Sequence, residues 1–395
     1  MRLIVDYYKS RELSGGVQSV LEQIRQLDPR NSRLISLTDA EKALGFDVVR
    51  PPPPSLRRTL FMRATDLARR LISRTTPFSP LIRELVMQAT MERPRWLPFE
   101  STASLAIDSY LKAYEELFGP QLVIRNSLVG NLIPLQSKQI CFINDDKVSG
   151  PELLFRRGYY DLGEFFTTRY GAVSLQLLSA RSASACVAPS SLVAKEMSKY
   201  GLKVHVIPHG IDTDFFRPLE KEALKREYGL SGKTVACWVG STHPIKGFDY
   251  VWRLARDFPE ITFILVFKDP TLLRSEQNVR IMGPCLPTKL RELYNIADFY
   301  ISTSVHESFG LCPMEAAACN TPVVSLRTGV FSDLKTDEVG CVVDEWNIME
   351  YRHAVRRMLR GHDNFRPRRF VQRELNLKKW RMQWRRLISG VDRAE

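Results

Sequence analysis

The segment from residue 297 to residue 326 most constrains the fold, because it reads as strand, turn, helix and strand in direct succession. Residues 297–304 are mostly apolar or small, which is typical of a buried strand. A turn is predicted at residues 306–310. Residues 311–319 are then predicted to form a helix, because Pro313 fits only a first turn and the alanines favour the helix body. A strand that returns through a helix is typical of a parallel α/β sheet.

The same alternation of strand and helix runs through both halves of the chain. The helical intervals between the predicted strands favour parallel sheets with crossover helices, and so two Rossmann-like halves. Strands are predicted at residues 2–5, 34–37, 122–124, 140–143 and 185–188 in the first half, and at residues 234–239, 261–267, 279–282, 299–303 and 322–326 in the second.

Composition excludes several classes of protein. No apolar run approaches the roughly 20 residues that span a bilayer. The apolar stretch at the start is too short for a signal peptide, since Asp6 interrupts it. The seven cysteines are scattered without metal-ligand spacing, and Cys312 and Cys319 are expected to pack in a core. A reducing cytoplasm is the expected location, with attachment to the inner face of the membrane left open.

The net charge of +13 is concentrated in two segments. Residues 57–95 carry nine arginines and three acids, and residues 352–386 carry thirteen Lys or Arg and two acids. Residues 57–74 have the pattern of a basic amphipathic helix, which either lies on an anionic membrane or packs on the sheet with a solvated arginine face. The C-terminal run, with Trp380 and Trp384, could instead dock against the first half. No nucleic-acid motif is present, so a nucleic-acid partner is not expected.

Two glutamates lie close to the start of the predicted helix at residues 311–319, one in the turn before it and one a turn into it. Amides near Gly310 and Leu311 at a helix N-terminus favour an anion such as phosphate. Carboxylates beside a phosphate make sense if they accept hydrogen bonds from hydroxyls. Glu307 is then predicted to contact a sugar and Glu315 a ribose, which together describe a nucleotide-sugar. The alternative for the two is a capping carboxylate and a solvated helix glutamate.

These residues carry a resemblance to a known family. Residues 306–324 resemble the Glu-x7-Glu signature of the family 4 retaining glycosyltransferases, also called glycosyltransferase group 1. Residues 206–218 resemble the family's interdomain segment, residues 238–247 its diphosphate loop, and residues 283–298 its base-binding loop and helix. The resemblance is strong from about residue 180 to residue 345, and four motifs in register are more specific than one.

The resemblance implies the GT-B fold, in which two Rossmann-like domains face each other across a cleft. The implied domains are an acceptor-side domain at residues 1–207, a nucleotide-sugar-binding domain at residues 208–375, and a helix at residues 376–395 that returns to the first domain. The implied reaction moves a hexosyl or N-acetylhexosaminyl group, with retention and without a metal ion. The donor is a nucleoside-diphosphate sugar, UDP-sugar more than GDP-sugar, and the acceptor is a hydroxyl of a glycolipid or growing polysaccharide. The alternative is a GT-B scaffold protein that has lost transfer.

The resemblance also assigns roles to single residues. Lys246 is expected to neutralise the leaving diphosphate, although the arginine that precedes it in the family is replaced here by the stretch Ser241, Thr242 and His243. Glu307 and Lys246 are the expected catalytic residues of the second half. The expected donor-binding residues are Gly15, Gly16, Gly240, Ser241, Lys246, Pro284, Phe309, Gly310, Leu311 and Glu315.

A second departure lies in the first half of the chain. Family members commonly hold the donor sugar with a histidine after the fourth strand, and no histidine precedes His205 here. Asn144 and Asp145 occupy the matching place, where they either accept a hydrogen bond from a sugar hydroxyl or only cap the following segment. His209 lies in the interdomain segment, where relatives often have asparagine, and a structural role is expected for it.

Overall fold

A computed structural model of the protein describes most of the chain beyond residue 135. It covers residues 3–6, 27, 32–35, 47–49, 115, 120, 122–126, 135–144, 148–166, 173–267, 276–334, 337–361 and 365–393. The predicted basic helix at residues 57–74 therefore lies outside the described residues.

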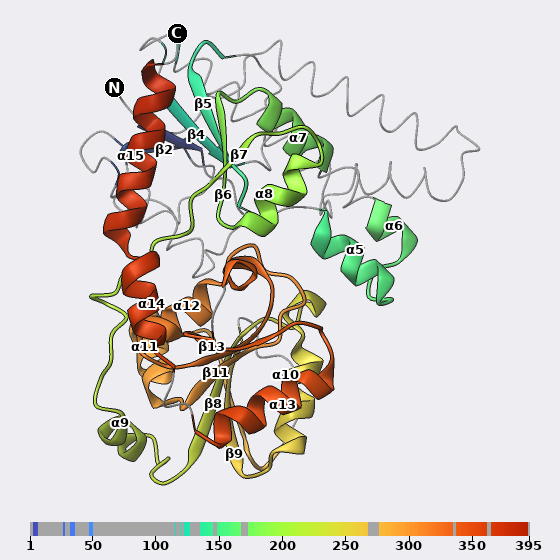
Figure 1. The fold of residues 1–395 in the computed structure, drawn as a ribbon, viewed down its shortest axis with the longest axis vertical. Helices are drawn as coiled ribbons and strands as arrows, with labels where there is room; N and C mark the ends of the chain where they lie inside the picture. The colour runs from blue at the N-terminus through green and yellow to red at the C-terminus, as the bar shows by residue number, and fades with distance from the viewer. Residues whose placement is uncertain are drawn as a thin grey trace.

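The described strands form two parallel sheets, one above the other in Figure 1. The first sheet has the order β3-β2-β1-β4-β5-β6-β7 and the second has the order β10-β9-β8-β11-β12-β13. The first sheet consists of β1 (Leu3–Asp6), β2 (Ser32–Ile35), β3 (Asp47–Val49), β4 (Leu122–Asn126), β5 (Lys138–Phe142), β6 (Ala185–Ala188) and β7 (Val204–Val206). The second consists of β8 (Thr234–Gly240), β9 (Ile261–Phe267), β10 (Val279–Met282), β11 (Phe299–Ser302), β12 (Val323–Leu326) and β13 (Gly340–Val343).

Helices accompany both sheets. Those that follow strands of the first sheet are α5 (Ser149–Arg156), α6 (Leu162–Phe166), α7 (Val173–Arg181) and α8 (Ser191–Ser198). The second half contains α9 (Lys221–Glu227), the 3₁₀ turn η3 (Pro244–Lys246), α10 (Phe248–Asp257), α11 (Pro287–Ile296), α12 (Leu311–Ala318), the 3₁₀ turn η4 (Gly329–Asp333), α13 (Ile348–Leu359), α14 (Pro367–Glu374) and α15 (Leu377–Arg393). None of the described helices is long and apolar enough to cross a membrane.

The second sheet is buried on both faces, as its apolar strands require. Side chains of β8 alternate between the faces, because successive residues of a strand point to opposite sides. Val235 and Cys237 join a core that includes residues of α11 and α12. Ala236 and Trp238 join the opposite core with residues of α10 and α13. The strand β9 is buried along its whole length.

The α/β prediction and most predicted strands are confirmed. The strands β6, β9 and β10 have the predicted bounds, whereas β2 begins two residues earlier than predicted. The prediction missed β3, β7 and β13. Each of these has three or four residues, too few to show a period, and β7 is half-buried or exposed throughout.

The helix α15 lies alongside the first sheet, on the left of Figure 1. Its buried residues Trp380, Trp384 and Val391 share a core with residues of β4 and β5. Lys138 at the start of β5 donates to the backbone carbonyls of Val391 and Asp392, at 3.1 and 2.9 Å. The predicted docking of this C-terminal run against the first half is therefore confirmed.

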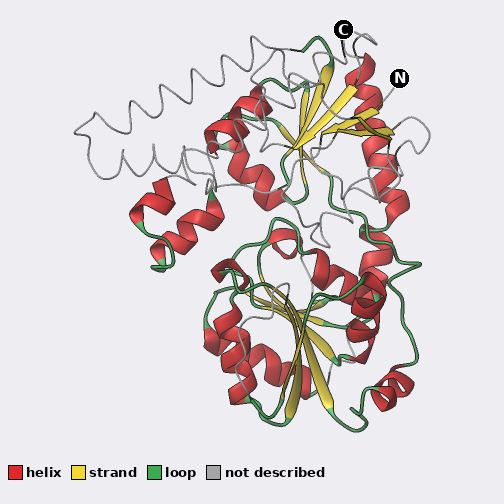
Figure 2. Ribbon diagram, turned by 180° about the vertical axis from the view of Figure 1, so that it is seen from behind, coloured by secondary structure: helices red, strands yellow, loops and turns green. Residues whose placement is uncertain are grey.

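The carboxyl ends of the two sheets face each other, and helices that follow them make contacts between the halves (Figure 2). Gly150 at the start of α5 lies against Ile245 of η3 and His306, since a Cβ added to it would be 3.0 Å from Ile245 Cδ1. Ser191 at the start of α8 donates its amide to Asp333 of η4 at 3.2 Å, and its hydroxyl bonds the same carboxylate. Residues after three strands of the second sheet thus meet the first half.

Candidate functional site

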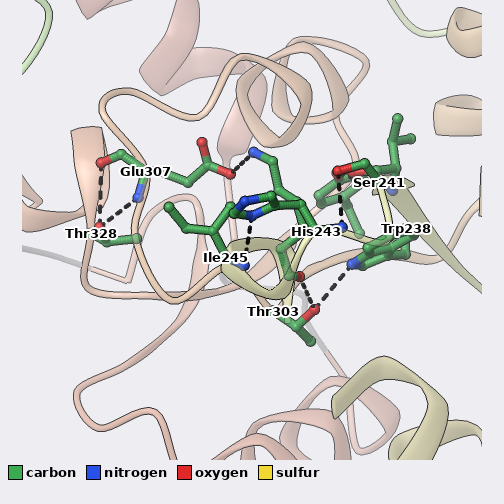
Figure 3. Close-up of polar contacts among 10 residues, drawn as sticks. Trp238, Ser241, His243, Ile245, Thr303, Glu307 and Thr328 are labelled. Carbon is green, nitrogen blue, oxygen red and sulfur yellow. Dashed lines mark hydrogen bonds and ion pairs between the residues drawn. The ribbon is translucent and has the colours of Figure 1, made fainter. Parts of the chain in front are cut away.

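The loop after β8 is fixed against the strand β11. Gly247 has a φ of +60°, and a Cβ on it would lie 2.0 Å from the carbonyl oxygen of Thr303, so only glycine fits there. The Thr303 hydroxyl donates to the carbonyl of Lys246 at 2.9 Å and accepts from Trp238 Nε1 at 3.0 Å (Figure 3). These contacts set the place of Lys246.

Lys246 and Glu307 form an ion pair at the centre of the site. Lys246 Nζ lies 2.6 Å from Glu307 Oε1, and the two side chains are 32% and 19% exposed. The backbone of Glu307 is held by Thr328, whose hydroxyl accepts from the Glu307 amide at 2.9 Å and donates to its carbonyl at 3.3 Å (Figure 3). Residues 61 positions apart in sequence are therefore brought together where β8 and β11 end.

The turn before α12 has the geometry of an anion site. Gly310 has a φ of +100° and caps α12, whose first amides have no partner within the helix. Phe309 is 3% exposed, and its carbonyl accepts from the Val330 amide at 2.9 Å. A Cβ on Gly329 would be 2.4 Å from that carbonyl oxygen. The turn Phe309–Leu311 is thus packed tightly on η4.

Glu315 lies one turn into α12 and is almost completely buried, with 9% of the residue exposed. The hydroxyl of Tyr294 on α11 donates to Glu315 Oε2 at 3.0 Å. Burial raises the pKa of Glu315 to about 7. The alternative of a solvated helix glutamate is therefore wrong for this residue. A buried carboxylate of this kind is stabilised by any further hydroxyl that donates to it.

The other predicted residues of the diphosphate loop have local structural roles. A Cβ on Gly240 would lie 2.5 Å from the ring of Trp238, so the glycine accommodates that ring. The Ser241 hydroxyl accepts from the His243 amide at 3.4 Å. His243 Nδ1 accepts from the Ile245 amide at 3.2 Å and caps η3, so that nitrogen already stabilises the turn. Pro284 is exposed and follows β10 at the same edge of the sheet.

In the first half, Asn144 is half-buried and follows β5, on the side that faces the second sheet. Asp145, Gly15 and Gly16 lie outside the described residues. His209 is 4% exposed, and burial lowers its pKa to about 4. Within the described part of the chain, no group of three or more His, Cys, Asp or Glu is placed to hold a metal ion.

Sequence reasoning missed Tyr294 and Thr328, which hold the two glutamates. Thr328 had a usable signal, because a polar residue and a glycine directly follow the predicted strand at residues 322–326. Tyr294 lies within residues 283–298, which resemble the base-binding loop and helix, but nothing in the sequence linked it to Glu315, 21 residues away on another helix. Cys312 and Cys319 are free thiols that pack with the core, as predicted.

Known proteins resemble this chain in fold and, over part of its second half, in sequence. Residues 220–373 match the family model of the glycosyl transferases group 1. Sucrose-phosphate synthase (tll1590) from Thermosynechococcus elongatus superposes with a TM-score of 0.73 at 16% identity, and the match covers 100% of both chains. The chain has the GT-B fold. The Anabaena protein Alr3699/HepE, solved with UDP and glucose, shares this GT-B fold with a TM-score of 0.68 at 15% identity, over 98% of this chain and 99% of that one.

The sequence match to one relative covers part of the GT-B fold. The D-inositol 3-phosphate glycosyltransferase of Segniliparus rotundus is 30% identical over 183 residues, which are 42% of this chain and 41% of that relative. The fold and the group 1 match support the coarser resemblance read from the sequence, whereas membership of family 4 stays a prediction.

Proposed function

We propose that this protein is a retaining, family 4 glycosyltransferase that moves a sugar from a nucleoside-diphosphate sugar to a hydroxyl acceptor. The observation that carries the proposal is the pairing of Lys246 with Glu307 beside the glycine-capped start of α12. One cation, a set of helix amides and a hydroxyl-binding carboxylate are the groups that a nucleotide-sugar needs. The group 1 match over residues 220–373 supports the same proposal.

The ion pair occupies the place that the donor would take. When the donor binds, its diphosphate replaces the Glu307 carboxylate as the partner of the Lys246 ammonium. The amides of Phe309–Leu311 bind the same phosphates. Glu307 is thereby released to accept a hydrogen bond from a hydroxyl of the sugar. Glu315 accepts hydrogen bonds from the ribose hydroxyls of the same donor.

In the proposed reaction the bond between the sugar and the diphosphate breaks on the face that the acceptor attacks, which retains the configuration. The departing phosphate takes the proton of the acceptor hydroxyl, so no side chain has to serve as the base. Asn144 follows β5 on the side that faces the second sheet, and we assign Asn144 and Asp145 to the sugar. Charge on the leaving group is balanced by Lys246 and the helix amides, and no metal ion is assigned a role.

We further propose a UDP-sugar donor, which fits the UDP-bound GT-B structure among the similar folds. A hexose or N-acetylhexosamine would be moved to a glycolipid or growing polysaccharide at the inner face of the membrane. The names of the relatives called D-inositol 3-phosphate glycosyltransferase contain a polyhydroxylated compound, which supports a hydroxyl as the accepting group.

The test is thermal unfolding of the purified chain with UDP, GDP, ADP and their glucose conjugates. A ligand at a hundredfold over its Kd adds about 2.7 kcal/mol of stability. The variant Lys246→Met should weaken binding of the stabilising diphosphate about 10- to 100-fold, because a charge-assisted contact is lost. Lys199→Met, which removes a lysine paired with Glu196 in the first half, should leave binding unchanged. No stabilisation by any nucleotide would contradict the proposal and favour the scaffold protein.

A further inference from the structure

One imidazole joins the two halves of the protein directly behind the anion-binding turn. The ring of His209 packs edge-to-face on Phe309, with ring centroids 4.9 Å apart and an interplanar angle of 88°. On its other side it packs edge-to-face on Phe142, at 5.7 Å and 77°. Phe142 ends β5 and lies two residues before Asn144. The same ring thus touches the turn expected to bind the diphosphate and the strand that leads to the expected sugar contact.

The backbone of His209 has little freedom to move. A Cβ on the next residue, Gly210, would lie 2.9 Å from both Leu377 and Trp380 at the start of α15. The Ile211 amide donates to the Leu375 carbonyl at 2.6 Å. Since the two residues directly after His209 are fixed in this way, we infer that the imidazole is a rigid contact that transmits the position of its neighbours.

Phe142 is itself fixed from behind. Its ring contacts Trp384 of α15, with centroids 5.9 Å apart at 64°. Trp384 in turn lies 6.0 Å from Trp380. The aromatic contacts therefore run without interruption from the C-terminal helix, through Phe142 and His209, to Phe309 of the turn.

We propose that His209 is a positioning residue for the donor diphosphate, which fixes the turn Phe309–Leu311 relative to the first half of the protein. The inference rests on the proposed function and deepens it. Without the imidazole, Phe309 would lose the ring that packs on it beside Phe142 of the first half, and it would be held by contacts of the second half alone, among them the hydrogen bond from Val330. The helix amides would then no longer be held where the phosphates bind.

The nature of the residue fits this role. Burial lowers the pKa of His209 to about 4, so the ring is neutral near pH 7 and adds no charge behind the phosphate site. Edge-to-face contacts are favourable for aromatic rings at these distances. Because the proposed role depends on packing, another aromatic ring at position 209 should also hold the turn in place.

The test compares UDP, which uses the turn, with uridine, which lacks the phosphates. In His209→Ala the affinity for UDP should fall about tenfold, the equivalent of one net hydrogen bond, while the affinity for uridine changes less than about twofold. His209→Phe restores a ring and should recover most of the UDP affinity. Phe258→Ala serves as the control, because it truncates a buried ring of the second half away from the turn. It should leave both affinities unchanged, even where it lowers stability.

A milder variant keeps the test useful if His209→Ala unfolds. Phe142→Leu leaves the interdomain segment intact and should lower UDP affinity in the same selective way. Equal losses for UDP and uridine, or no loss in either variant, would overturn the positioning role. If the wild type binds no nucleoside diphosphate, the proposed function fails instead, so the two failures are distinguishable.

Discussion

The substitution Glu315→Gln tests whether this carboxyl is as isolated from water as its surroundings imply. Glu315 is buried beneath the start of α12 and receives one hydrogen bond, from Tyr294. Glutamine has nearly the same shape and can accept the same bond through its carbonyl oxygen. The variant therefore removes the ionisable group and leaves the packing in place.

The magnitude follows from the pKa of Glu315, which burial raises from 4.5 to about 7. Because the pKa in the folded state is higher, the folded protein keeps a proton that the unfolded chain releases between about pH 4.5 and pH 7. The free energy of unfolding falls over this window as pH rises, by about 3 kcal/mol in total. Glutamine has no such loss. The variant should match the wild type at pH 4.5 and exceed it by about 2–3 kcal/mol at pH 8.

The assay is urea unfolding of both proteins across this pH range, with the difference between them as the readout. The difference matters because His209 acts in the opposite direction. The pKa of His209 is lowered from 6.5 to about 4, so its contribution to the free energy of unfolding is lost as pH falls from about 6.5 to about 4. That term is common to both proteins and cancels. Glu292→Gln is the control of opposite sign, because a hydrogen bond from Tyr228 lowers the pKa of that carboxyl. A Glu315→Gln variant that is less stable at pH 8, or a difference that does not change with pH, would refute the reasoning.

Two further predictions concern binding and the contact between the halves. The affinity for UDP should rise about tenfold per pH unit up to about pH 7 and then level off, because ribose hydroxyls donate to the ionised form of Glu315. Titration calorimetry at several pH values measures this affinity. The same dependence on pH in Glu315→Gln would contradict the prediction. Arg157 lies 4.1 Å from the ring centre of Trp346, a contact worth about 0.5–1 kcal/mol. Arg157→Ala should therefore speed amide hydrogen exchange in α5. Arg156→Ala, which loses only a pair with Glu152 within the same helix, should not; equal exchange in both variants would refute the contact.

The elements that sequence reasoning predicted well are those whose signal is local. The strand β9 is apolar except for Thr262, and α12 is marked by a glycine, a proline and an alanine run within ten residues. Asn320, predicted to end this helix, has a φ of +67°, the left-handed conformation typical of such a position. The GT-B fold followed from the order of such elements and from four motifs.

The features that sequence reasoning missed depend on contacts between distant parts of the chain. The spacing of Glu307 and Glu315 predicted a site, but the burial of Glu315 under Tyr294 is a property of how α11 packs on α12. The prediction that Gly240 lets the backbone approach a phosphate stays a prediction, and the structure adds that this glycine accommodates the ring of Trp238, two residues before it.

The segment before Lys246 lacks the arginine of the resembled family, so the proposed diphosphate site needs another source of attraction. Because Lys246 is paired with Glu307, the two side chains together contribute no net charge to the site. Attraction for a diphosphate then depends on the amides at the start of α12, and amides bind well only when they are already oriented. The turn before α12 is oriented by η4 on one side and by His209 on the other. If the proposed function holds, rigid placement of these backbone dipoles by contacts between the halves replaces part of the attraction that a second cation would supply, and loss of packing behind the turn should then weaken phosphate binding selectively.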